Sequence, residues 1–176
     1  MLALVRTVSM EGMVAIAMPV GRGLAQLTGP GAALQSGVAV RFLGIDIGEK
    51  RVGVAEGDSS VGVAVPHSTL RRTSDRQLIA ELRMLAAESN AEVLVVGEPR
   101  RLDGSAGSAA RRARAFAERL GRACELPVRT VNESLTSIEA ERRLRSAGID
   151  PRKHPERVDA TAAQIILQEA LDRETG

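Results

Sequence analysis

The chain has 176 residues, a length that suits one domain with a buried core and is short for two. Its composition, 44% hydrophobic and 26% charged, is typical of a globular protein, and the formal net charge is only +2. An aromatic content of 1% argues against a binder that stacks bases on aromatic side chains. The single cysteine, Cys124, excludes an internal disulfide and a cysteine-rich zinc site.

Residues 1–37 differ from the rest of the chain because they are small, apolar and rich in glycine and alanine. We interpret them as a poorly ordered extension or as a start codon assigned too early, and we assign no function to them. The stretch from Gly12 to Val20 is too short to span a bilayer. We therefore expect a cytoplasmic protein without a membrane partner, whose folded domain covers residues 38–176.

The first predicted elements are the two strands of a β-hairpin. Apolar residues occupy positions 42–45 and 52–55, and a turn-like Gly-Glu-Lys-Arg sequence separates them. The alternation of a strand places Asp46 on the same face as Phe42. An aspartate in a buried strand is costly unless it is paired or binds a metal. Asp46 is therefore either the start of an ordinary turn or a carboxylate that binds metal or phosphate. Three glycines leave the backbone around it bare, as where a ligand approaches closely: Gly44, Gly48 and Gly53.

The later patterns predict three more strands and four helices. A third apolar run covers 61–65 and ends at Pro66, where we expect its strand to stop. The following elements are a helix opened by a capping box at 74–77, a strand at 93–97, a helix at 108–122, a strand at 128–131, and helices at 136–148 and 155–172. Strands that first form hairpins and later alternate with helices imply a mixed α/β sheet with helices on its faces.

Acidic residues follow the ends of several predicted strands. Glu98 and Glu133 come directly after the fourth and fifth strands, and Asp46 ends the first. Because ligands of such sheets gather at the carboxyl ends of parallel strands, we expect these side chains along one sheet edge. On the last helix, Asp159 falls at helical spacing with the apolar stripe, so it points the same way as the buried side chains.

These four carboxylates, with no histidine or cysteine among them, form a set of hard oxygen ligands suited to Mg²⁺ or Mn²⁺. Two such ions would activate a water molecule and stabilise the leaving oxygen during phosphodiester hydrolysis. Each residue also has an ordinary structural explanation, as a solvated loop charge or as the partner of a helix dipole. Taken together, the four residues favour a metal site.

Basic residues frame this candidate site. Nearly all cationic residues are arginines, which suit bidentate phosphate contacts. Arg100 and Arg101 lie in the loop after the fourth strand, and Lys50 and Arg51 lie in the hairpin turn. We expect these four residues to contact the phosphates of a nucleic acid.

The chain resembles the YqgF family, also called RuvX, over essentially all of residues 38–172. Four motifs in the same order carry the resemblance: GIDIGEKRVGVA, VVGEPRRLDGSAG, NESLTSIEAERRL and VDATAAQIILQEAL. It implies a ribonuclease H-like fold, with a five-stranded mixed sheet in the order 3-2-1-4-5. It also implies a metal-dependent endonuclease that either resolves four-way (Holliday) DNA junctions or processes the 5′ end of pre-16S ribosomal RNA. In that enzyme Asp46, Glu133 and Asp159 are the catalytic metal ligands.

Two of the four motifs depart from the family pattern. The third motif usually reads Asp-Glu-Arg, whereas this chain has Asn132, Glu133 and Ser134. The second motif usually reads Gly-Leu-Pro, whereas this chain has Glu98 in the middle position. We hypothesise that Glu98 adds a carboxylate near the metals and compensates for Asn132.

Two alternative functions follow from the same residues. The hairpin also resembles the phosphate-binding opening of ATPases of the sugar kinase, actin and Hsp70 type, although these need two such lobes and favour Thr or Ser where this chain has Glu49. The other alternative is a non-catalytic factor associated with nucleic acid or the ribosome, whose degenerate site has lost metal affinity.

A junction resolvase would act as a homodimer, because it cuts two strands symmetrically.

Overall fold

The computed structural model describes residues 39–99, 107–132 and 136–175. The strands are β1 (Arg41–Ile47), β2 (Arg51–Asp58), β3 (Val63–Arg71), β4 (Val93–Glu98) and β5 (Val128–Asn132). The helices are α2 (Asp75–Glu88), α3 (Ser108–Cys124), α4 (Thr136–Ser146) and α5 (Pro155–Thr175). The predicted extension at 1–37 lies outside the described residues. None of the described helices is both long enough and apolar enough to cross a bilayer.

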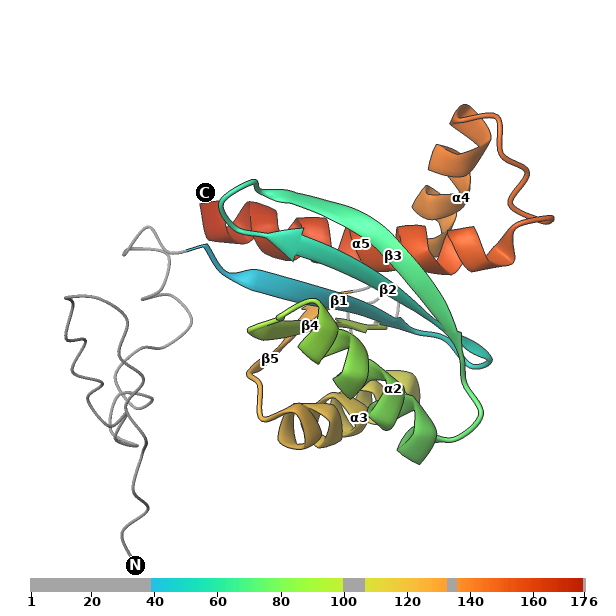
Figure 1. The fold of residues 1–176 in the computed structure, drawn as a ribbon. Coiled ribbons are helices and arrows are strands. Elements are labelled where there is room, and N and C mark those ends of the chain that lie inside the picture. The colour runs from blue at the N-terminus through green and yellow to red at the C-terminus, as the bar shows by residue number, and fades with distance from the viewer. Residues whose placement is uncertain (1–38, 100–106, 133–135, 176) are drawn as a thin grey trace, which may run out of the picture.

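The strands form one five-stranded mixed sheet in the order β3-β2-β1-β4-β5 (Figure 1). β1 lies at its centre, antiparallel to β2 and parallel to β4, and β4 is parallel to β5. β1, β2 and β3 form an antiparallel meander. The fold class and the strand order that the sequence led us to expect are therefore confirmed.

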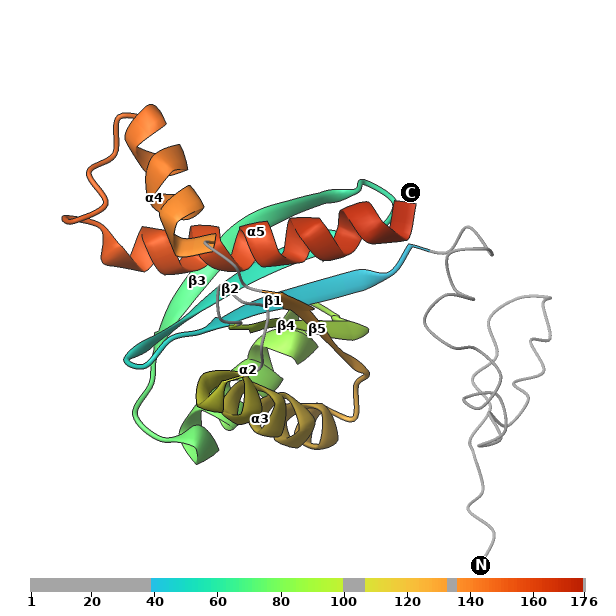
Figure 2. The same ribbon diagram turned by 180° about the vertical axis from the view of Figure 1, so that it is seen from behind.

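Alternate residues of β1 belong to two separate cores on the two faces of the sheet. Leu43 and Ile45 are fully buried among leucines and Phe116 from α2 and α3. Phe42 lies on the other face with Leu167 and other apolar residues of α5. Figure 2 shows the same division, with α5 across one face and α2 and α3 across the other. The predicted alternation along this strand is therefore confirmed.

β3 is longer than its sequence pattern predicts. It continues past Pro66 to Arg71, so the prediction that the strand stops at the proline is wrong. The register with β2 shifts between Val54 and Ala55, and Pro66 pairs with Ala55 at this irregularity. Because β3 is an edge strand and the ladder is already interrupted there, a residue without an N–H group is tolerated.

The outer edge of β3 is covered by glutamine side chains of α5. The Ala64 N–H donates to Oε1 of Gln168 over 2.9 Å, and Nε2 of Gln164 donates to the Ala64 carbonyl oxygen over 2.8 Å. Nε2 of Gln168 also donates to the carbonyl oxygen of Gly62 over 2.9 Å. These bonds satisfy backbone groups that would otherwise offer an open pairing edge to another strand. α4 packs against α5 and extends beyond the sheet (Figure 1).

Candidate active site

Asp46 lies near the carboxyl end of the central strand, on the face that α5 covers. It is two residues beyond Gly44, where an added Cβ would lie 2.7 Å from the Cβ of Leu167 on α5. Only 7% of Asp46 is exposed. Its cross-strand neighbour in the ladder is Gly53 of β2. The ladder with β2 fixes the backbone that carries this side chain.

Asp159 reaches the same place from α5. A Cβ built on Gly53 would lie 1.9 Å from the main-chain oxygen of Asp159, so the helix backbone rests directly on the strand at this glycine. Because Gly53 is the residue paired with Asp46, the strand and the helix bring Asp46 and Asp159 to one location. The side chain of Asp159 is 22% exposed and therefore stays accessible from solvent.

Arg51 contacts the carboxylate of Asp159 directly. Its Nε donates a hydrogen bond to Oδ2 of Asp159, and its side chain is 40% exposed. Arg51 begins β2, two residues before Gly53, so both lie on the face that α5 covers. Its neighbour Lys50, in the β1–β2 turn, is exposed. Two of the four predicted phosphate contacts therefore lie beside the candidate site.

Glu98 points away from these residues. It is 1% exposed and accepts two hydrogen bonds from Arg114 of α3, 2.6 Å from Nε and 2.8 Å from Nη2. The hydrogen bonds to Glu98, and then its negative charge, raise the pKa of the Arg114 guanidinium above its usual value. Ile45 pairs with Val96, so Glu98 falls in phase with Ile47 and faces α3. The structure therefore does not bring Glu98 together with Asp46 and Asp159, and does not support its predicted place in the metal site.

Three other predicted residues lie outside the described residues: Glu133, Arg100 and Arg101. β5 ends at Asn132, whose ladder partner is Glu98 at the end of β4. The last residue of β5 therefore comes directly before Glu133 in the sequence. Within 39–99, 107–132 and 136–175, no group of three or more His, Cys, Asp or Glu side chains is placed to hold a metal ion.

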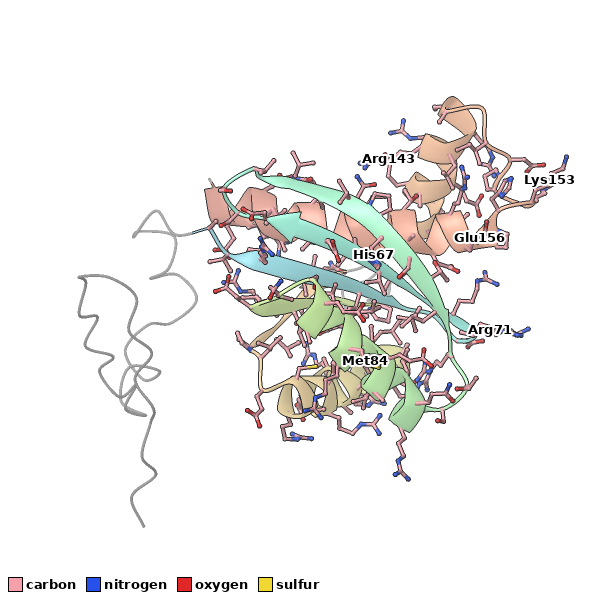
Figure 3. All side chains as sticks on the ribbon, in the orientation of Figure 1. His67, Arg71, Met84, Arg143, Lys153 and Glu156 are labelled. Atoms are coloured by element: carbon pink, nitrogen blue, oxygen red, sulfur yellow. The ribbon has the colours of Figure 1, made fainter. Side chains whose placement is uncertain are left out.

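One residue near the site was missed by the sequence analysis. Arg71 pairs directly with Arg51 in the β2–β3 ladder, so the two side chains project from the same face. Nearby, Oγ1 of Thr69 donates to the carbonyl oxygen of Glu156 over 2.6 Å and ties the end of β3 to the start of α5. Figure 3 shows Arg71 at the same end of the molecule as Glu156. Ending the third strand at Pro66 hid this pairing, and no other sequence signal indicates it.

Two cavities beside the sheet are lined by none of the described candidate carboxylates. A cavity of about 310 Å³ lies at the opposite end of the strands and is lined by residues such as Arg41, Val61 and Ser89. It contains none of the candidate carboxylates. A smaller cavity of about 130 Å³ lies between the β1–β2 turn and α3, lined among others by Glu49 and Arg112. The candidate site at Asp46 is therefore identified by its carboxylates and the arginine beside them, and not by the size of a cavity.

The strand order and the helices on both faces of the sheet are those of the ribonuclease H-like fold. Among solved structures, Thermus thermophilus RuvC matches with a TM-score of 0.51 at 14% sequence identity, covering 78% of this chain and 97% of that one. At this identity the similarity shows a shared fold.

The family is shown by sequence. A family model described as "RuvX: Holliday junction resolvase" matches residues 40–173, and the chain belongs to the RuvX family. A protein of Anaeromyxobacter sp. (strain Fw109-5) is 43% identical over 133 residues, which cover 76% of this chain and 97% of the relative. A protein of Thermosynechococcus vestitus is 41% identical over 133 residues, covering 76% of this chain and 88% of the relative. Both relatives carry the name "Putative pre-16S rRNA nuclease".

Proposed function

We propose that this protein is a metal-dependent endonuclease that hydrolyses phosphodiester bonds at the site of Asp46 and Asp159. The observation that carries the proposal is the contact of α5 with Gly53, which joins a carboxylate of the central strand to one of the last helix. Membership of the RuvX family supports the same class of reaction. The alternative of an ATPase has no such support. It was based on the hairpin of β1 and β2, and the RuvX family match includes that hairpin.

The donor set fits a hard divalent cation. Asp46 and Asp159 offer carboxylate oxygens, and Glu133, directly after β5, would supply a third. The absence of histidine and cysteine from this set favours Mg²⁺ or Mn²⁺ over zinc. Two such ions, when bound, would supply the Lewis acidity that activates water and stabilises the leaving oxygen.

The residues of the chain position the ligands and the substrate. Asp46 would be the most firmly placed metal ligand, because only 7% of it is exposed and the β1–β2 ladder fixes its backbone. Asp159 and Glu133 would be the other two ligands. Lys50 and Arg51 lie beside the site, and they would hold the substrate backbone together with the loop residues Arg100 and Arg101.

The substrate we propose first is a structured precursor of 16S ribosomal RNA, because relatives of 43% and 41% identity carry that name. A four-way DNA junction is the second candidate, favoured by the description of the matching family model. A junction substrate would require a homodimer that cuts two strands symmetrically. Either substrate is consistent with a cytoplasmic enzyme.

Cleavage by the purified protein in Mn²⁺ or Mg²⁺ tests the proposal. A synthetic four-way junction and a pre-16S RNA fragment would be offered side by side to the wild type and to Asp46→Asn. We expect the substitution to lower cleavage by at least about a hundredfold, since it removes a charged metal ligand. Glu118→Gln, on the exposed face of α3, is the matched control and should cleave as the wild type does.

The pattern of products separates the candidate functions. Cuts in the RNA alone would establish ribosomal RNA processing, and paired symmetric cuts in the junction would establish a dimeric resolvase. If neither substrate is cut and calorimetry detects no Mn²⁺ binding, the nuclease proposal fails. The protein would then be the non-catalytic factor with a degenerate site.

A further inference from the structure

We propose that Arg51 is the built-in counter-ion of the metal-free site, and that it leaves Asp159 for a substrate phosphate when a divalent cation binds. This inference rests on the proposed function, because it assigns a second role to a residue of the same site. Arg51 is thus a positioning residue that holds the carboxylates before metal arrives and serves the substrate afterwards.

The first support is the geometry of the ion pair. The Nε of Arg51 donates to the same Asp159 carboxylate that the proposed metal would use. The side chain of Arg51 is 40% exposed and that of Asp159 is 22% exposed, so the ion pair is accessible to solvent and does not lie in the core. A side chain with this exposure can exchange its partner without disturbing the packing around Gly53.

The second support is electrostatic. Two carboxylates held close together by a strand and a helix repel each other, and burial increases the cost because Asp46 is only 7% exposed. A nearby cation relieves this repulsion in the absence of metal. A divalent cation that binds the same oxygens repels the guanidinium and competes with it, so the two cations exclude each other at Asp159.

The third support is the position of Arg71. It pairs with Arg51 in the ladder, and like charges directly opposite each other on one sheet face are destabilising. The ion pair with Asp159 neutralises one of these two charges in the metal-free protein. Once metal has displaced Arg51 from Asp159, both arginines are available beside the bound cation. Two neighbouring guanidinium groups are well suited to hold a phosphodiester backbone.

The test is a comparison of Mn²⁺ affinity with nucleic-acid affinity. We expect Arg51→Gln to bind Mn²⁺ about tenfold more tightly than the wild type, which corresponds to 1.4 kcal/mol, because the competing cation is gone. The same variant should bind the uncleaved substrate more weakly in Ca²⁺. Arg51→Lys keeps the charge and should restore most of the wild-type Mn²⁺ affinity. Arg71→Gln should weaken substrate binding and leave the Mn²⁺ affinity within about twofold.

Calorimetric titration of the full chain measures the metal, and thermal unfolding with and without Mn²⁺ gives a second readout. The metal-free Arg51→Gln protein should unfold at a lower temperature than the wild type. Mn²⁺ should raise its unfolding temperature by more than it raises that of the wild type. Arg76→Gln, on the exposed surface of α2, is the matched control and should change neither affinity. A metal affinity of Arg51→Gln that equals or falls below that of the wild type would overturn the inference and leave the proposed nuclease intact. Failure of the wild type to bind Mn²⁺ would overturn both.

Discussion

Gly53 shows how a single missing side chain organises the candidate site. The bare backbone around Asp46 was interpreted from the sequence as an approach route for a ligand. At Gly53, the structure instead shows the backbone of α5 in that space, with the main-chain oxygen of Asp159 1.9 Å from where a Cβ would lie. The glycine therefore acts on the site through the helix that it allows to approach. The distance between strand and helix at this point sets where Asp159 lies.

Gly53→Ala is expected to lower the free energy of unfolding by about 1–3 kcal/mol, the usual cost of overpacking, and to weaken Mn²⁺ binding. The added methyl group would push α5 away and move Asp159 from its place beside Asp46. Gly148→Ala is a suitable control, since its φ of 76° makes alanine unfavourable while nothing lies within 4 Å. Chemical denaturation and calorimetry measure the two effects. If Gly53→Ala lost stability but kept its Mn²⁺ affinity, the contact of α5 with Gly53 would not be needed for metal binding.

The buried carboxylate of Glu98 makes Arg114 important for stability. Arg114→Met would leave a 1%-exposed charge without the partner that supplies two of its hydrogen bonds. We expect a clear fall in the unfolding midpoint, and a recovery in the double variant Glu98→Leu, Arg114→Met, in which an apolar pair replaces the ion pair. Thermal denaturation of the two variants checks this. A double variant no more stable than Arg114→Met would contradict it.

At the scale of elements, the sequence predicts most strands and helices because their apolar residues recur at the regular spacing of a strand or a helix. The capping box at Ser74 begins α2 as expected, with the Gln77 N–H donating to Oγ over 3.2 Å. The sequence analysis ended the third strand too early, at Pro66, because the effect of a proline depends on whether its strand lies at the edge of the sheet. That position in the sheet is a tertiary property. The missed half of β3 carries Arg71, so this error also concealed an arginine near the candidate site.

The glutamines of α5 should keep the β3 edge from pairing with another molecule. Replacing both Gln164 and Gln168 by alanine removes three hydrogen bonds to the backbone of 62–64, at about 1 kcal/mol each. We expect the free energy of unfolding to fall and the variant to self-associate at concentrations where the wild type does not. Sedimentation velocity over a concentration series measures this. Arg173→Gln, also on α5, is the control and should leave the association state unchanged.

The stability of α4 should depend on acid pH. Hydrogen bonds from Arg142 and then Arg143 lower the pKa of Glu139 from 4.5 to about 2. A carboxyl group whose pKa is lower in the folded state stabilises that state above pH 4.5, and this contribution is lost as the pH falls toward 2. Between pH 6 and 3, the wild type should therefore lose more stability than Glu139→Gln. Because the group is exposed, the difference should shrink in 1 M salt. Equal pH profiles would contradict the prediction.

For the whole molecule, the sequence predicts the placement of a side chain when it follows from the repeat of a single strand or helix. It does not predict a placement that depends on the register between two strands. Strand alternation places Asp46 on its observed face, and helical spacing places Asp159 on the face of α5 that meets the sheet. Glu98 was misplaced because its direction depends on the pairing of Ile45 with Val96. A shift of one residue in that register would turn Glu98 to the other face. No pattern within either strand specifies this pairing.

The contact between α5 and Gly53 also has a consequence for the timing of activity during synthesis. Asp46 belongs to the first described strand, whereas Asp159 belongs to a helix that follows every strand of the sheet. Domains fold as they leave the ribosome, with the N-terminal parts emerging first. While the C-terminal residues are still enclosed in the exit tunnel, a nascent chain has its central strand but lacks Asp159. A nuclease with the ligand set proposed above would not cut nearby RNA until translation has released the helix that carries Asp159.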